Sequence, residues 1–315
     1  MPRTRPKARM AALIAFLGLA FVMGRGLAAA QSLDIPSKRW GLSFGNSSEF
    51  TGLRFNFRDS RVKRITGVNV TLWGPRQNNE EAVVTGLSFG PLPGGGHLRG
   101  IQIGLLGIVG LKSITGVSVA PLGLGAGESV AGVNLAGLGM GAGKNLVGIN
   151  VAGLGLGAGE NAVGINIAGL GLGAGKNMIG LNFGGIGLGA GEKLVGFNVG
   201  GIGVGAGDCL TGITIAGLAA GSTEIRGLTV AGAAVGGQTV KGLQIAGGMV
   251  HVVKDGRLLG CAVSPFNYIR GAQVGLTVGI VNYARSVKGV QLGLINIVRD
   301  NPRGLKVLPV FNTSF

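Results

Sequence analysis

Residues Gly148–Val163 read GINVAGLGLGAGENAV, and the following residues, Gly164–Ile179, read GINIAGLGLGAGKNMI. Both stretches begin with a glycine, an apolar residue, an asparagine and a second apolar residue, and both continue with glycines that alternate with Leu and Ala. Apolar side chains at every second position are typical of a β-strand. Because the whole pattern recurs after 16 residues, it predicts a repeat architecture built of β-strands.

The repeat extends far beyond this stretch. Other copies begin 16 residues apart, weaker copies flank them, and the step later shortens to 15 residues. The starting glycines of this block are Gly100, Gly116, Gly132, Gly180, Gly196, Gly212, Gly227 and Gly242. The same opening phrase recurs with irregular spacing at Gly67, Gly86, Gly271 and Gly289. We therefore expect regular repeats over 100–250, between an irregular N-terminal β region or cap at 31–99 and an irregular C-terminal one at 251–315.

The composition excludes several protein classes. The chain has 315 residues, of which 66 are Gly and only 10 are Pro, so it lacks the proline content of collagen. Apolar residues make up 46%, which is too many for a disordered chain. Each glycine inside a helix costs about 0.8–1 kcal/mol relative to alanine. An all-β, glycine-rich protein is the remaining interpretation.

The first thirty residues, 1–30, resemble a signal peptide. A basic start is followed by an apolar run from Met10 to Gly24, and the small residues Ala28–Ala30 predict cleavage before Gln31. The run is shorter than the roughly 20 residues of a membrane-spanning helix. We therefore expect export to the periplasm, outer membrane or cell surface of a bacterium.

Removal of this leader changes the charge balance. Of the 28 basic residues five lie in the leader, which leaves 23 basic and 12 acidic residues and a net charge of +11. The basic excess lies in the two ends, 31–115 and 216–315, while 116–215 is nearly neutral. Nucleic-acid binding would favour basic residues interleaved with aromatics, and only 5% of the chain is aromatic. We expect no nucleic-acid partner.

One repeat unit is expected to form one coil of a β-solenoid. Val147, Ile149 and Val151 alternate with small or polar residues, and Leu154, Leu156 and Ala158 then alternate in the opposite parity. Successive side chains of a strand point to opposite sides, so a corner at 152–153 is needed to bring both trios to one interior. A second corner at 159–161 would close the coil. The expected interior is Val/Ile/Val against Leu/Leu/Ala, with outer faces of Gly, Asn and Ala.

Two columns of side chains favour stacking of such coils. The residue two positions after the starting glycine is an amide or hydroxyl in most copies, and stacked amides about 4.8 Å apart can hydrogen-bond. The corner residues alternate in sign for most of the block: Glu128, Lys144, Glu160, Lys176, Glu192 and Asp208. Opposite charges on adjacent coils would attract, so this alternation favours a stack of coils in one register.

The alternative architecture is an outer-membrane β-barrel that forms a pore or passive channel. The tail Gly304–Phe315 ends in Phe like the last strand of such barrels, and 272–280 alternates cleanly, with Gln273 and Thr277 on a possible lumen face. Against a barrel, residues 116–260 contain only two aromatics, Phe183 and Phe197, and the change of parity would break the lipid-facing band.

No catalytic, cofactor-binding or metal-binding residue is predicted. Gly143-Lys144-Asn145 lacks the earlier glycine and the Ser or Thr of a phosphate-binding loop, so we expect no nucleotide. His97 and His251 are the only histidines and have no ligand-like spacing to other residues. Cys209 and Cys261 lie about three repeats apart, too far for an intrachain disulfide in a regular stack.

The C-terminal third carries a resemblance. Gly289-Val290-Gln291-Leu292-Gly293-Leu294-Ile295-Asn296, and the related stretch 271–282, resemble bacterial exported "surface repeat" proteins. That resemblance implies a cell-envelope location and no defined activity. The expected function is a non-enzymatic, structural or surface-interaction role, with a polysaccharide, a membrane or a protein of the envelope as partner.

Overall fold

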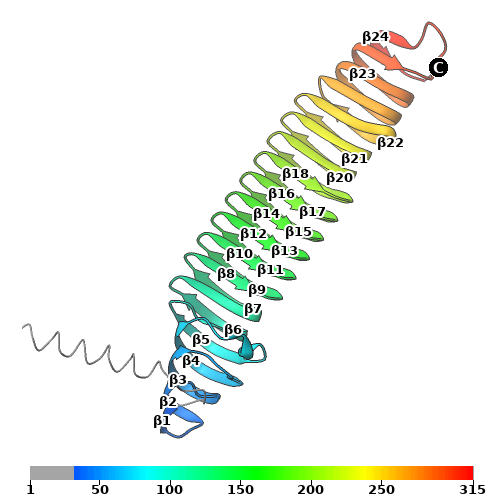
Figure 1. Cartoon of the computed structure of the whole chain (residues 1–315). Coiled ribbons are helices and arrows are strands. Elements are labelled where there is room, and N and C mark those ends of the chain that lie inside the picture. The colour runs from blue at the N-terminus through cyan, green and yellow to red at the C-terminus, as the bar shows by residue number, and fades with distance from the viewer. Residues whose placement is uncertain (1–31, 315) are drawn as a thin grey trace, which may run out of the picture.

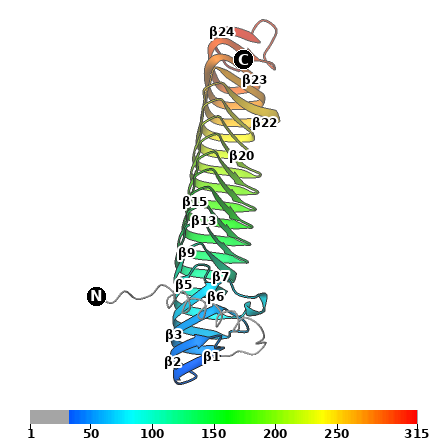
Figure 2. The same ribbon diagram turned by 60° about the vertical axis from the view of Figure 1, so that its left-hand side comes forward.

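The computed structural model describes residues 32–314 and shows a parallel β-solenoid, as the repeat predicts. Figures 1 and 2 show its coils following one another along a single axis, with β1 at one end and β24 at the other. The expected signal peptide, 1–30, and its cleavage point lie outside the described residues.

Each central coil consists of one long and one short strand. The long strands are β9 (Ser129–Ala136), β11 (Asn145–Ala152), β13 (Asn161–Ala168), β15 (Asn177–Gly184), β17 (Lys193–Gly200) and β19 (Cys209–Ala216). The short strands are β8 (Gly123–Ala126), β10 (Gly139–Ala142), β12 (Gly155–Ala158), β14 (Gly171–Ala174), β16 (Gly187–Ala190) and β18 (Gly203–Ala206). The two expected corners are confirmed, since strands end at Ala152 and Ala158.

The two ends of the described chain continue the stack with strands of more variable length. On the N-terminal side lie β1 (Ser32–Pro36), β2 (Trp40–Gly45), β3 (Glu49–Arg58), β4 (Arg64–Trp73), the short 3-10 helix η1 (Gln77–Asn79), β5 (Val83–Gly90), β6 (Gly94–Gly104) and β7 (Gly107–Ala120). On the C-terminal side lie β20 (Ala219–Ala231), β21 (Ala234–Ala246), β22 (Met249–Val263), β23 (Phe266–Val298) and β24 (Val307–Asn312).

Strand pairing joins equivalent residues of successive coils. Asn150 pairs with Asn166, and Leu156 pairs with Leu172, both in parallel strands. Pairing is antiparallel only at the two ends of the described chain, where β1 pairs with β2 and β24 pairs with β23. The barrel alternative is therefore wrong, because the strands of an outer-membrane barrel are antiparallel to their neighbours.

The starting glycine of each repeat, here called the unit glycine, has a left-handed backbone. Gly148 has a φ of 110° and Gly164 a φ of 117°. A Cβ on Gly164 would lie 2.1 Å from the carbonyl oxygen of Gly148 on the adjacent coil. Only glycine allows both this dihedral angle and this close approach. The recurring glycine is thus required by the stacking distance.

At the irregular C-terminal end, the left-handed unit glycines show where each coil begins. Gly260, Gly275 and Gly289 stack on one another, with φ values of 128°, 120° and 140°. The expected start at Gly271 is wrong, since its φ is not in the left-handed region and Gly275 occupies the unit position. Gln273 therefore lies in the interior column that holds leucines elsewhere, opposite Leu258 of the previous coil.

The interior is the reverse of the expected one on the long strand. Leu146, Asn150 and Ala152 are buried, with exposed fractions of 0%, 0% and 2%, whereas Val147 and Ile149 are 43% and 39% exposed. On the short strand Leu156 and Ala158 are buried as expected, but Leu154 is exposed. Buried residues keep even numbers through the whole coil, so the predicted change of parity does not occur.

The reason is the narrow space between the long and short strands. The core of most central coils holds one large side chain from each strand, such as Leu146 and Leu156, together with alanines at the corners, and in β13 the large side chain is replaced by Ala162. A second row of β-branched side chains would overfill it. Asn150 is small enough to fit between the two strands, and its side-chain amide hydrogen-bonds to the equivalent amides on the two neighbouring coils. The Val and Ile side chains consequently point outward.

Candidate interaction surface

The outer face of the long strands carries a continuous apolar strip. We define the apolar strip as the residues one and three positions after each unit glycine, from Leu42 and Phe44 to Val290 and Leu292. In the first column these are Leu42, Leu53, Val68, Leu87, Ile101, Val117, Val133, Ile149, Ile165, Leu181, Phe197, Ile213, Leu228, Leu243, Cys261, Leu276 and Val290. The second column reads Phe44, Phe55, Val70, Phe89, Ile103, Val119, Leu135, Val151, Ile167, Phe183, Val199, Ile215, Val230, Ile245, Val263, Val278 and Leu292. None of them is buried, and none carries a charge.

The apolar strip is formed because identical positions of successive coils lie in register. Val133, Ile149 and Ile165 are direct partners in neighbouring parallel strands. Strand spacing places such partners about 4.8 Å apart. Monomeric soluble proteins rarely expose a contiguous apolar patch larger than a few hundred Å². A strip that runs along nearly the whole described chain is therefore a candidate interaction surface.

Within residues 32–314, the column on the other side of the unit glycine carries charges only toward its two ends. Between Thr115 and Thr211 it holds Ala, Val and Ile alone. Toward the ends it holds basic residues and no acidic ones: Arg99, Arg226, Lys241 and Lys288. The middle of the strip is thus electrically neutral, and its ends are flanked by positive charge.

A second apolar feature, the leucine ridge, follows the corner between long and short strands. Its side chains are 46–55% exposed: Leu106, Leu122, Leu138, Leu154, Leu170, Ile186, Ile202 and Leu218. The backbone holds them in line, since the amide of Leu154 donates to the carbonyl of Leu138 at 2.7 Å. The ridge borders the outer face of the short strands.

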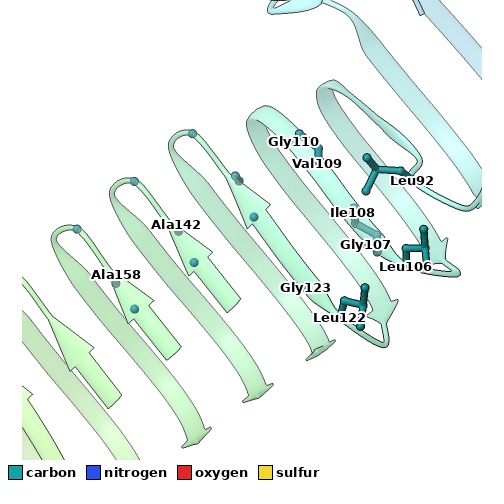
Figure 3. Close-up of a pocket in the computed structure, with 17 residues that line it drawn as sticks. Leu92, Leu106, Gly107, Ile108, Val109, Gly110, Leu122, Gly123, Ala142 and Ala158 are labelled. Carbon is teal, nitrogen blue, oxygen red and sulfur yellow. The ribbon is translucent and has the colours of Figure 1, made fainter. Parts of the chain in front are cut away.

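That face of the short strands, the glycine face, is nearly free of side chains, as expected. Gly155 and Gly157 point outward from β12, and Gly171 and Gly173 occupy the same positions on β14. At its N-terminal end the face forms a shallow hollow of about 850 Å³. Figure 3 shows Leu92, Leu106 and Leu122 beside this hollow. Its lining offers almost no polar side-chain atom for recognition of a polar ligand.

The remaining corner, which precedes each long strand, forms a polar edge. Lys144 contacts Glu128 at 3.4 Å and Lys176 contacts Glu160 at 3.2 Å, so the predicted stacking of alternating corner charges is confirmed. Beside them, the amide of Asn161 donates to Asn145 at 2.9 Å. The central coils therefore have one polar edge and an otherwise apolar or bare perimeter.

One carboxylate of this edge is strongly perturbed. Glu224 accepts hydrogen bonds from Arg226 at 2.6 Å and from Lys241 at 2.7 Å. These two hydrogen bonds lower the pKa of the Glu224 carboxyl to about 2. The carboxylate is thereby kept ionised, and it neutralises part of the basic charge beside the C-terminal part of the strip.

No family model, curated protein or solved structure matches this chain. The resemblance to exported surface repeat proteins therefore remains a prediction from the sequence. Within residues 32–314, no helix has the length and hydropathy needed to span a membrane.

The predicted column of stacked amides exists, but it lies inside the coil. Asn134, Asn150, Asn166, Asn182 and Asn198 are all 0% exposed. Each of the first four donates its Nδ2 to the Oδ1 of the next at 2.9–3.0 Å. A buried amide is costly unless it is hydrogen-bonded, and here each coil supplies the partner for the next.

At the N-terminal end the same interior column holds an ion pair that the sequence reasoning missed. Arg54 and Asp59 are 0% and 1% exposed, and their side chains are 2.7 Å apart. Arg54 also donates to Ser47 at 3.0 Å and to Asn69 at 2.9 Å. The available signal was the position of Arg54, two residues after Gly52, where an interior residue belongs. Its hydrogen bonds join neighbouring coils.

The other residues weighed from the sequence lie apart from one another. His97 contacts Ser113 at 2.7 Å, and the ring of His251 lies tilted against Tyr268 with ring centroids 5.5 Å apart. Cys209 and Cys261 are both free and partly exposed. Over 32–314 no group of three or more His, Cys, Asp or Glu side chains could hold a metal ion. Lys144 lies at a corner between β10 and β11, as its alternation with Glu predicts.

Proposed function

We propose that this chain is a non-enzymatic, exported repeat protein of the bacterial cell envelope with a structural or surface-interaction role. The observation that carries the proposal is the apolar strip, which gives a long rod one continuous contact face. The coils stack through backbone hydrogen bonds and interior amides, so the rod presents the strip as a preformed surface. A preformed surface loses little conformational entropy on binding.

The interior polar groups also support a structural role. Asn150 and Asn166 bond to amides of adjacent coils, and Arg54 bonds to Asp59 and Asn69. Their hydrogen-bonding capacity is used to hold coils together. The apolar segment and small residues at 1–30 support export. The candidate partners are a polysaccharide, a membrane or a protein of the envelope. We do not propose a pore, because that alternative required an outer-membrane β-barrel and the strands form a solenoid instead.

The location of the mature protein tests this proposal. The full chain, carrying a C-terminal tag, is expressed in a Gram-negative bacterium, and cytoplasm, periplasm and membranes are separated. We expect a chain that begins at Gln31 outside the cytoplasm. The control Leu17→Arg places a charge in the apolar segment of the leader and should leave the chain unprocessed. An unprocessed wild-type chain in the cytoplasm would overturn the proposal.

A further inference from the structure

We infer that the apolar strip is the interface to a second copy of this chain, packed face to face along the rod. The inference deepens the proposed interaction role by naming its partner, but it does not depend on export. Three observations carry it: the area of the strip, an aromatic pair near its middle, and its repeat period.

The area is sufficient for a stable dimer. The strip extends from Leu42 to Leu292 over successive strands about 4.8 Å apart, so it is about 80 Å long. Two side-chain columns about 7 Å apart make it about 10 Å wide, which amounts to roughly 800 Å² seen face-on. A standard stable protein interface takes about 800 Å² from each partner.

One pair of large aromatic side chains lies near the middle of the strip. Phe183 and Phe197 come from adjacent coils, and their rings are 5.8 Å apart. Toward the C-terminal end the strip is aliphatic apart from Cys261, whereas its N-terminal coils carry three further phenylalanines, Phe44, Phe55 and Phe89. Interfaces obtain most of their binding energy from large aromatic anchors near the centre. The pair Phe183 and Phe197 has this central place in the strip.

A second copy also matches the strip in its period, and the centre of the strip carries no charge that would oppose the contact. Side chains recur once per coil, and another copy offers an identical row at the same spacing, whereas lipid chains have no such order. The central columns from Val133 to Ile215 hold no charged residue, so two copies would not repel there. Face-to-face contact of one patch with itself gives the closed symmetry of most homodimers.

The mass of the purified mature chain tests the inference. We expect light scattering to give twice the chain mass at micromolar concentration. The double variant Ile149→Lys with Leu181→Lys should halve that mass, because it would bury charges in an apolar interface. Both side chains are already 39% and 43% exposed, so the coil should still fold. Circular dichroism checks that it does.

The matched control changes the polar edge of the same region. Asn161→Lys also adds positive charge, in a column where Lys193 already stands one step beyond Asn177. We expect this control to keep the dimer mass. If the double variant and the control have the same mass, the strip is not the interface and the inference is overturned.

The two native cysteines offer a second readout. Cys261 is part of the strip, opposite Leu243 and Leu276 of its neighbouring coils, whereas Cys209 lies in the column of the polar edge. Both are partly exposed in one chain. In the wild type we expect a maleimide to label Cys209 at least tenfold faster than Cys261. In the Lys double variant the two rates should become similar.

The outcomes separate this inference from the proposed function. A wild type that is monomeric at all concentrations, with Cys261 as reactive as Cys209, overturns the dimer. If that monomer floats with phosphatidylcholine and phosphatidylglycerol vesicles, lipid covers the strip instead. Cytoplasmic location with an intact dimer would overturn export alone, and exported monomers would overturn the dimer alone.

Discussion

At the scale of single residues, the two kinds of glycine in each coil differ in what they do. Gly164 has a left-handed φ and no room for a Cβ, which would lie 2.1 Å from the carbonyl oxygen of Gly148 on the preceding coil. Gly171, on the glycine face, has no heavy atom within 4 Å of an added Cβ. Both glycines recur every 16 residues, but only the unit glycine is required by the backbone conformation and by the packing of the coils.

Alanine substitution at these two glycines should separate the two roles. We expect Gly164→Ala to lower the free energy of unfolding by about 2–4 kcal/mol, through backbone strain and a clash between coils. Gly171→Ala should change it by less than about 1 kcal/mol, in either direction. Urea titrations followed by circular dichroism measure both. Equal losses would mean that stacking distance does not select the unit glycine.

The two asparagine columns provide a second comparison within one coil. Asn166 lies in the interior, where it donates to Asn182 and accepts from Asn150. Asn166→Ala would leave two buried amide groups unpaired, and we expect a loss of about 2–5 kcal/mol. Asn161→Ala also removes two amide bonds, but at the half-exposed edge, where water replaces them. This variant should lower the free energy of unfolding by only about 1 kcal/mol. Similar decreases for Asn161→Ala and Asn166→Ala would contradict the burial of the Asn166 column.

Glu224 predicts a dependence of stability on pH. Hydrogen bonds from Arg226 and Lys241 lower its pKa to about 2, whereas an unfolded glutamate titrates near 4.3. Between these values the unfolded chain binds more protons, so this contribution to stability is complete above about pH 4.3 and is lost as the pH falls towards 2.

The variant Glu224→Gln should therefore lose less stability than the wild type over that range. Thermal melting between pH 2 and pH 6 measures it, and the difference should be small because Glu224 is only partly buried. Asp208→Asn is the control, since Asp208 forms no salt bridge within residues 32–314. A steeper acid loss in Glu224→Gln would contradict the assigned sign.

At the scale of elements, the two antiparallel strands at the ends close an otherwise open stack. β24 covers the last coil, where Leu292 pairs with Phe311 and Ile297 pairs with Val307. β1 covers the first coil in the same way through its pairing with β2. An uncovered parallel strand would expose a row of unpaired backbone groups to other chains.

Removal of β24 should expose that edge. We expect a chain that ends at Arg303 to form open-ended assemblies, because each uncovered β23 edge can pair with another chain. A chain that ends at Thr313 keeps β24 and is the control. Light scattering over time distinguishes them: growth without limit is expected for the first and a fixed mass for the second. A stable fixed mass for both would mean that β24 is dispensable as a cap.

At the scale of the whole molecule, the rod is close to a sum of similar coils, so its length should be adjustable. Deletion of 148–163 removes one coil and joins equivalent positions, but it places Lys144 next to Lys176. Deletion of 148–179 removes two coils and places Lys144 next to Glu192. Repeat proteins tolerate such deletions because each unit contacts mainly its neighbours.

We expect both deletions to fold, with the rod shorter by about 4.8 Å for each coil removed. Small-angle scattering measures the length. The one-coil deletion should gain stability from added salt relative to the two-coil deletion, because salt screens its Lys–Lys contact. The effect should stay below about 1 kcal/mol, as for other exposed pairs. Failure of both to fold would contradict a coil-by-coil solenoid.

The sequence by itself determined the all-β class, the 16-residue period, the two corners and the amide and charge columns. These features are periodic, and a stack of coils converts sequence period directly into spatial alignment. The stacked amides, the corner ion pairs and the glycine face could be predicted for that reason, although the amides were expected on the outer face and lie inside the coil. Arg54 was missed, because it occurs once in a column that holds amides and hydroxyls at most other positions, and its position after Gly52 was the one signal for it.

Only the tertiary structure decided which side of the long strand faces inward. Alternation places Val147 and Ile149 on one face of the strand and Asn150 and Ala152 on the other. It does not say which of the two faces points to the interior. Hydrophobicity alone favours Val and Ile inside. The narrow gap between long and short strands, and the amide partners that stacking supplies, reverse that preference. The apolar residues are thereby left on the surface, where they form the strip that a second copy can cover.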